Sequence, residues 1–338
     1  MYRRKPKRVE RPVFPNTIEG FGYIVKENGE IRSKENDTPY EFQVIPKDQS
    51  YNEARYKAFI DLVGDLVEER LQNNLGFKKV IVPVNADPSK NEPHSYIYMT
   101  PNALTTMDKL AILFPGHNNR IGQWSKRAMC DENIESGSMI RVSRLLQSQG
   151  YEVILLNSNG NFWVDNKTSV RIPFRRPVIL SLRSFQILNS KAQANRMAVI
   201  ANGWGGSNFT DLLNNHFDFI KSRVRAVTIA NSTHTLDLIH GSDKRAWMID
   251  NVVNWSVGQE AKGEVINDRR FGCTCLSAAV ELADFVLPSC LPEMLRFIGV
   301  KMGEITEMEN ESDGEEDGKL TAEEEAEVAA HLNVVSIG

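Results

Sequence analysis

Cysteine is scarce in this sequence, and the few cysteines present do not have the spacing of metal ligands. The 338 residues include four, at Cys130, Cys273, Cys275 and Cys290. Cys273 and Cys275 form a CxC pair rather than CxxC, and no second pair or histidine cluster completes a zinc site. We therefore predict reduced thiols in a cytosolic or nuclear protein, with no metal and no other cofactor.

Long apolar stretches are missing as well. No run of about 18 apolar residues occurs, so we predict neither a membrane-spanning helix nor a membrane partner. The basic start of the chain lacks the apolar segment that a secretory signal requires. With 41% hydrophobic and 25% charged residues, the chain can bury one large core.

The net charge of −4 conceals two strongly charged ends. Residues 1–12 sum to +5, and residues 304–327 sum to −11. Because such blocks are typical of solvated tails, we predict a basic arm (1–12), a folded domain (13–302) and a largely disordered acidic tail (303–338) with a short helix at 322–332. The arm can serve solubility, nuclear import or contact with RNA. The residues assigned to import or RNA contact are Arg3, Arg4, Lys5, Lys7 and Arg8.

Short apolar runs alternate with helical stretches along the folded part. Helical spacing of Ala58, Leu62, Leu66 and Leu71 predicts an amphipathic helix over 53–73. Strands are predicted at 79–84, 94–99, 109–114, 152–156, 197–201 and 224–230, with β-like pieces at 21–25 and 40–44. Apolar strands alternating with helices indicate an α/β fold: a mostly parallel central sheet with helices on both faces. In such sheets, functional residues gather in loops beyond the carboxyl ends of the strands.

Three of these loops have the composition of a hydrolase site. Pro115-Gly-His-Asn-Asn-Arg-Ile-Gly-Gln-Trp124 follows one strand, as does the Gly-rich loop that helps to form the oxyanion hole of α/β-hydrolases. Asn202-Gly-Trp-Gly-Gly-Ser207 has the strand–turn–helix pattern of a nucleophile elbow. An elbow presents Ser or Cys at its turn, but Gly203 stands there. Asn231-Ser-Thr-His234 follows the next strand, where a triad carboxylate is expected. We predict an α/β-hydrolase-like fold without its nucleophile.

Further motifs extend this pattern over most of the chain. They are Phe21-Gly-Tyr23 with Asn28-Gly-Glu30, Gly122-Gln-Trp124, Glu132-Asn-Ile-Glu-Ser-Gly137, Gly150-Tyr-Glu-Val-Ile-Leu-Leu-Asn157, and Trp247-Met248 with Asn254-Trp255. In this order and spacing, residues 13–298 resemble the Arb-two (argonaute-binding protein two) domain family, in its animal cotranscriptional-regulator branch. That family's elbow reads approximately Ala-His-Ser-Tyr-Gly-Gly, which aligns its serine with Gly203. Its aspartate aligns with Asn231 and its late histidine with Val280.

The resemblance implies that all three candidate triad positions are degenerate. Glycine offers no nucleophile, asparagine cannot stabilise an imidazolium as a carboxylate does, and valine cannot transfer a proton. We therefore predict a pseudoenzyme rather than an enzyme, acting as a scaffold for protein contacts in nuclear RNA metabolism. The resemblance implies ribonucleoprotein, spliceosomal, Argonaute or chromatin partners, and a nuclear location with the cytoplasm as a second one. The residues predicted to surround a vestigial pocket are Gly116, His117, Gln123, Trp124, Trp204, Ser207 and His234.

One alternative is a hydrolase or esterase of unknown substrate that uses Ser207 as a displaced nucleophile, with His234 or His117 as its base. Against it, Ser207 can cap the helix expected after it, and both histidines can be structural. A serine or cysteine at the elbow within hydrogen-bond reach of a histidine would favour the enzyme. The basic stretch Arg171-Ile-Pro-Phe-Arg-Arg176 is open to peripheral RNA contact or to a solvated loop.

Overall fold

A computed structural model describes residues 12–83, 86–90, 92, 94–160 and 191–306, and the backbone of 162–165 and 168–171. The import or RNA residues Arg3–Arg8, the helix expected at 322–332 and residues 172–176 of the basic stretch lie outside the described residues. Within these ranges, no helix is both long and apolar enough to cross a membrane.

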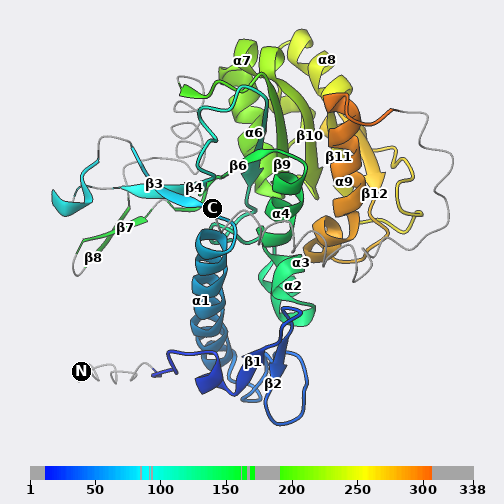
Figure 1. Ribbon diagram of the computed structural model, residues 1–338. Coiled ribbons are helices and arrows are strands. Elements are labelled where there is room, and N and C mark those ends of the chain that lie inside the picture. The colour runs from blue at the N-terminus through cyan, green and yellow to red at the C-terminus, as the bar shows by residue number, and fades with distance from the viewer. Residues whose placement is uncertain are drawn as a thin grey trace, which may run out of the picture.

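The centre of the fold is an eight-stranded sheet with the order β12-β11-β10-β9-β5-β6-β4-β3 (Figure 1). Its strands are β3 (Lys78–Val82), β4 (Ser95–Met99), β5 (Lys109–Phe114), β6 (Glu152–Leu155), β9 (Arg196–Asn202), β10 (Val224–Ala230), β11 (Val252–Ser256) and β12 (Thr274–Ser277). Strand β4 is antiparallel to both of its neighbours, and the other strand pairs are parallel. This order, with only the second strand reversed, is that of the α/β-hydrolase fold. The predicted mostly parallel sheet is confirmed.

Helices cover both faces of the sheet (Figure 1). They are α1 (Gln49–Asn73), α2 (Lys126–Asp131), α3 (Ile134–Gly137), α4 (Ile140–Ser148), α6 (Trp204–Asn215), α7 (Phe217–Arg223), α8 (Ser242–Asn251) and α9 (Val286–Met302). Strand β5 shows the alternation that places them, since neighbouring side chains point to opposite faces. Ala111 and Leu113 join a core with α1, α4 and α9, whereas Leu110 and Ile112 join one with α6, α7 and α8.

Helix α1 packs through an apolar line slightly different from the predicted one. It begins after Asp48, whose carboxylate accepts a hydrogen bond from the backbone N–H of Tyr51. The fully buried line is Phe59, Val63, Val67 and Leu71, and the predicted Ala58, Leu62 and Leu66 are half-buried beside it. This line packs beside a small hairpin of β1 (Tyr23–Val25) and β2 (Ile31–Ser33). A second hairpin consists of β7 (Phe162–Asp165) and β8 (Thr168–Arg171).

The β-like piece expected at 40–44 is not a strand, and that prediction was wrong. Its aromatic residues Tyr40 and Phe42 instead belong to an aromatic cluster on α1, and Val44 is exposed. The Tyr40 ring stacks on Phe59 with ring centroids 4.4 Å apart and lies 5.2 Å from that of Tyr23. Arg55 donates a hydrogen bond to the Tyr40 hydroxyl at 2.9 Å. Packing of isolated side chains against a helix therefore produced the apolar pattern without strand pairing.

The folded body extends slightly past the boundary expected at residue 302. Gly303 ends α9 in the left-handed conformation, which turns the chain back onto the sheet. The Glu304 carboxylate forms an ion pair with Lys109 at 2.6 Å and accepts a hydrogen bond from the Tyr151 hydroxyl. The Ile305 side chain packs against Gly299. Residues up to Ile305 therefore contact the domain, although the charge pattern had assigned them to the tail.

Candidate functional site

The turn between β9 and α6 has the geometry of a nucleophile elbow, with glycine at its apex. Gly203 adopts φ 50° and ψ −114°, a combination that residues with a Cβ rarely populate. Its backbone N–H donates to the carbonyl oxygen of Ala230 at 2.8 Å, and its own carbonyl accepts from the N–H of Gly206 at 3.0 Å. Helix α6 starts at the very next residue, Trp204. The backbone thus makes the sharp strand-to-helix turn on which hydrolases expose a nucleophile.

The space above this turn is open. A Cβ placed on Gly203 meets no heavy atom of the described residues within 4 Å. By contrast, a Cβ on Gly205 would come within 2.9 Å of Phe114, and one on Gly206 within 2.1 Å of the Ser232 hydroxyl. These two glycines let α6 approach the sheet closely, whereas Gly203 serves the backbone conformation alone. A serine at position 203 would meet conformational strain but no steric obstacle.

Ser207 does not cap α6, and that prediction was wrong. The helix begins at Trp204 rather than after Ser207, so Gly205, Gly206 and Ser207 all lie within its first turn. The Ser207 hydroxyl lies 2.9 Å from the Thr233 hydroxyl, and these two groups share a hydrogen bond at the surface. A serine becomes a nucleophile only when a base lies within hydrogen-bond reach of it.

His234 is fully buried and is held by hydrogen bonds away from Ser207. Its Nε2 lies 2.8 Å from the carbonyl oxygen of Phe271, so this nitrogen carries the proton and donates. Nδ1 therefore accepts from the Ser232 hydroxyl at 2.5 Å. Burial lowers the pKa of His234, although the hydrogen bond to Phe271 opposes the shift. Both nitrogens are engaged structurally, which leaves neither to act as the base for Ser207.

His117 lies on the surface beside the elbow. Its ring packs against the ring of Trp204 with centroids 5.4 Å apart. Trp204 itself is 53% exposed, a large apolar surface directly next to Gly203. In the described part of the chain, the hydrogen bond of Ser207 goes to Thr233 rather than to His117 or His234. The Ser207 enzyme alternative therefore has no support from this geometry.

The other two candidate triad positions follow strands β10 and β12, which are separated in the sheet by β11. Asn231 directly follows β10 in a left-handed conformation with φ 46°, and its N–H donates to the carbonyl oxygen of Trp255 at 2.6 Å. Val280 follows β12, where it is half-buried and packs against the core that contains α9. Strand β12 is the eighth strand of the sheet in chain order, the position after which a hydrolase supplies its histidine. Val280 contributes apolar surface there.

The loop after β5 is fixed to the elbow by asparagine side chains that the sequence analysis did not single out. The carbonyl oxygen of Trp124 accepts from the amide nitrogens of Asn119 (2.6 Å) and Asn202 (2.9 Å). Asn159 donates to the carbonyl oxygen of Gly116 at 2.7 Å. These hydrogen bonds hold the loop that contains Gly116 and Trp124 beside the elbow, and both residues are buried. The only sequence signal was the high asparagine content of these loops.

Gln123, the remaining residue predicted for the vestigial pocket, is 1% exposed and lines a cavity on the side of the loop that faces α1 and β4. The other six predicted pocket residues do not line that cavity. Among the described residues, no three His, Cys, Asp or Glu side chains form a group that could hold a metal ion.

Comparison with known proteins gives a family match over most of the chain. Residues 14–187 and 182–262 match the Arb2 domain. The cotranscriptional regulator ARB2A of Homo sapiens is 26% identical over 343 residues, which are 86% of this chain and 82% of that protein. Its homologue in Gallus gallus is also 26% identical, over 88% of this chain and 83% of that protein. A homologue in Dictyostelium discoideum is 20% identical over 83% of this chain and 79% of that protein.

Solved structures give more distant similarity. A histone deacetylase from Saccharomyces cerevisiae has a TM-score of 0.48 and 13% identity, covering 72% of this chain and 98% of that chain. An esterase of the bacterial hormone-sensitive lipase family has a TM-score of 0.39 and 11% identity, covering 78% of this chain and 94% of that chain.

Proposed function

Because the chain belongs to the Arb2 domain family, we propose that it is a catalytically inactive, hydrolase-like scaffold for protein contacts in nuclear RNA metabolism. The partners that we propose are ribonucleoprotein or spliceosomal proteins, Argonaute or chromatin proteins. The relatives are named as cotranscriptional regulators rather than as enzymes, which supports a role linked to transcription. The proposed nuclear location is supported by these relatives and by the basic residues at the start of the chain.

The observation that carries this proposal is the presence of glycine in an elbow that has otherwise kept its shape. Gly203 has the strained backbone that presents a nucleophile, and the space above it is open, yet it has no side chain. Asn231 and Val280 follow β10 and β12, where a carboxylate and a histidine would complete a triad. We propose that the fold retained its frame and lost its chemistry, since a fold can host binding once its reactive groups are gone.

We propose that the surface beside the elbow is the docking surface. Trp204 and His117 form an exposed ring pair at the rim of this open space. Tryptophan is enriched among the residues that dominate protein–protein binding energy, because it buries a large apolar area on contact. Its attachment to the first turn of α6 fixes the backbone that carries it.

The experiment is affinity purification of the tagged, full-length chain from nuclear extract, with and without ribonuclease, followed by mass spectrometry. The wild type, Trp204→Ala and Ile249→Ala are compared. Ile249 is 62% exposed on α8 and serves as the matched apolar control. We expect RNA-processing or chromatin proteins to be enriched by the wild type and by Ile249→Ala, and to be reduced for Trp204→Ala. Enrichment of no such protein, or equal enrichment by all three, would contradict the proposal.

A further inference from the structure

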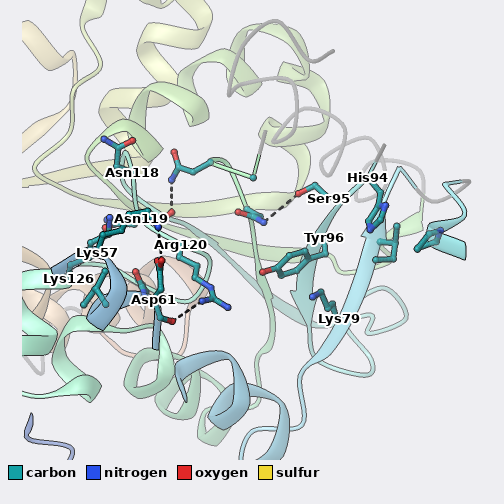
Figure 2. A pocket seen from close by; sticks show the side chains of 17 residues that line it. Lys57, Asp61, Lys79, His94, Ser95, Tyr96, Asn118, Asn119, Arg120 and Lys126 are labelled. Carbon is teal, nitrogen blue, oxygen red and sulfur yellow. Dashed lines mark hydrogen bonds and ion pairs between the residues drawn. The ribbon is translucent and has the colours of Figure 1, made fainter. Parts of the chain in front are cut away.

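A cavity of about 1010 Å³ lies between α1, the β3–β4 hairpin and the loops after β5 and β6 (Figure 2). It is separate from the candidate triad positions, because Gly203, Asn231 and Val280 do not line it. Figure 2 shows basic side chains at both ends, with Lys57 and Lys126 on the side of α1 and Lys79 and His94 on the side of the hairpin. The volume is at the upper end of the range typical of small-molecule sites.

Two of the basic groups in this cavity are already neutralised by carboxylates. Lys57 forms an ion pair with Asp61 at 2.6 Å along α1. The Arg120 guanidinium lies between Asp65, at 2.7 Å, and the buried carboxylate of Glu68. Burial acts against the charge of Arg120, but these carboxylates raise its pKa, so Arg120 stays charged and paired. Lys57 and Arg120 therefore belong to the wall of the cavity, and their charges are balanced by carboxylates of the protein.

Lys79 and Lys126 differ from them, because no carboxylate of the described residues lies within ion-pair distance of either. The ammonium of Lys79 lies 3.7 Å from the centre of the Tyr96 ring, an attraction that holds its charge at the cavity. Lys126 is half-buried, and burial lowers its pKa. The nearby charge of Asp61 opposes this shift without reversing it, and an anion in the cavity would compensate the desolvated charge of Lys126 further.

The cavity also presents neutral polar groups. Gln123 lines it and is 1% exposed, and neither the oxygen nor the nitrogen of its amide has a hydrogen-bond partner within the described ranges. A buried amide without partners is costly, so a ligand that gives this amide a partner would be favoured. Asn119 and Asn159 also line the cavity, and each directs its amide nitrogen to a backbone carbonyl. Their amide oxygens therefore face away from those carbonyls, as acceptors for hydroxyl or amino groups.

We propose that this cavity binds a nucleoside phosphate. The phosphate would lie near Lys126, and the sugar hydroxyls and base edge would meet the amides of Gln123, Asn119 and Asn159. Phosphate alone would fill only a small part of about 1010 Å³ and would not use the acceptor oxygens. An acidic peptide would also satisfy the lysines, and its backbone N–H groups can donate to these oxygens, so such a peptide is included in the test as a competitor. A free nucleotide and a nucleotide within single-stranded RNA share the required chemistry.

The test is isothermal titration calorimetry of the full-length protein with five kinds of probe. They are the nucleoside monophosphates, adenosine, inorganic phosphate, an oligoglutamate peptide and a 5′-phosphorylated single-stranded RNA. We expect at least one monophosphate, or the RNA, to bind roughly tenfold or more tightly than adenosine, phosphate or the peptide. Preference for RNA over every free nucleotide would identify RNA as the source, and the reverse would identify the free nucleotide. Equal binding of phosphate or of the peptide would overturn the proposal, as would no binding by any phosphorylated nucleoside.

Variants separate this site from a structural role. Lys126→Met removes a desolvated charge and Gln123→Leu removes two unpartnered polar atoms, so both should keep or raise the Tm of the free protein. Both should nevertheless weaken binding roughly tenfold or more. Lys221→Met, on α7 at the opposite face of the sheet, is the matched control and should bind like the wild type. Unchanged binding in Lys126→Met, or weakening only where the Tm also falls, would contradict the assignment.

Discussion

Replacing Gly203 by alanine adds a single methyl group to the apex of the elbow, and the structure defines its effect on stability. No heavy atom of the described residues lies within 4 Å of the added Cβ, so steric overlap contributes nothing. The whole effect comes from the backbone, where φ 50° and ψ −114° are unfavourable for any residue with a Cβ. A residue held in such a sparsely populated conformation costs about 1–3 kcal/mol.

The sign of the change in the free energy of unfolding distinguishes a strained backbone at Gly203 from an unstrained one. At a glycine with an unstrained backbone, alanine would stabilise the protein by about 0.4–1 kcal/mol through the entropy of the unfolded chain. We expect a loss of about 2 kcal/mol in the free energy of unfolding for Gly203→Ala, measured by urea denaturation. Gly206→Ala, whose Cβ would lie 2.1 Å from the Ser232 hydroxyl, should lose more because it adds overlap. A neutral or stabilising Gly203→Ala would refute the elbow geometry.

Two further predictions concern buried ionisable groups. Burial lowers the pKa of His234, so below about pH 6.5 this histidine takes up a proton in the unfolded chain before it does so in the folded one. The free energy of unfolding is therefore highest above this pH. It falls by at most about 1.4 kcal/mol per pH unit as the pH decreases toward the folded-state pKa. In His234→Gln, the dependence of the urea midpoint on pH over this range should disappear. The comparison is made in a His216→Gln background, because burial also lowers the pKa of His216. An unchanged dependence on pH would contradict the prediction. Arg120→Met should cost about 3 kcal/mol because it leaves the buried Glu68 carboxylate with the Tyr96 and Tyr98 hydroxyls but without its cation. Glu68→Gln combined with Arg120→Met should cost less, because the neutral amide oxygen still accepts from these hydroxyls; a larger loss in the double variant would contradict the pairing.

The central strands of the fold could be predicted because each is a continuous apolar run. Strands β5, β6, β9 and β10 were located to within a residue or two in this way. Strands β11 and β12 were missed, since β11 contains Asn254 and β12 lies at the edge of the sheet. Asn254 is fully buried, yet it is stable there because its side chain bonds the N–H of Ser232 and the hydroxyl of Ser256. Such tertiary hydrogen bonds leave no periodic signal in the sequence.

The site was predicted unevenly for similar reasons. The turn at Gly203 follows from the order of strand, glycines and helix, but the start of α6 was placed too late. Gly205 and Gly206 look like loop residues in the sequence, yet they lie in α6, and their close approach to Phe114 and Ser232 explains why these helical positions are glycine. The basic cavity was not predicted at all. Its three lysines come from α1, β3 and the start of α2, which are far apart in the chain and share no motif.

The central claim, that Ser207 is not an activated nucleophile, is tested most directly by intact-mass spectrometry after incubation with a fluorophosphonate probe. This probe bonds covalently to activated serines, and a known serine hydrolase run in parallel establishes that it is reactive. Because Ser207 shares its hydrogen bond with Thr233 and both ring nitrogens of His234 are engaged elsewhere, we predict an unchanged mass for the wild type. A stoichiometric adduct on the wild type that disappears in Ser207→Ala would contradict the account and favour the hydrolase alternative.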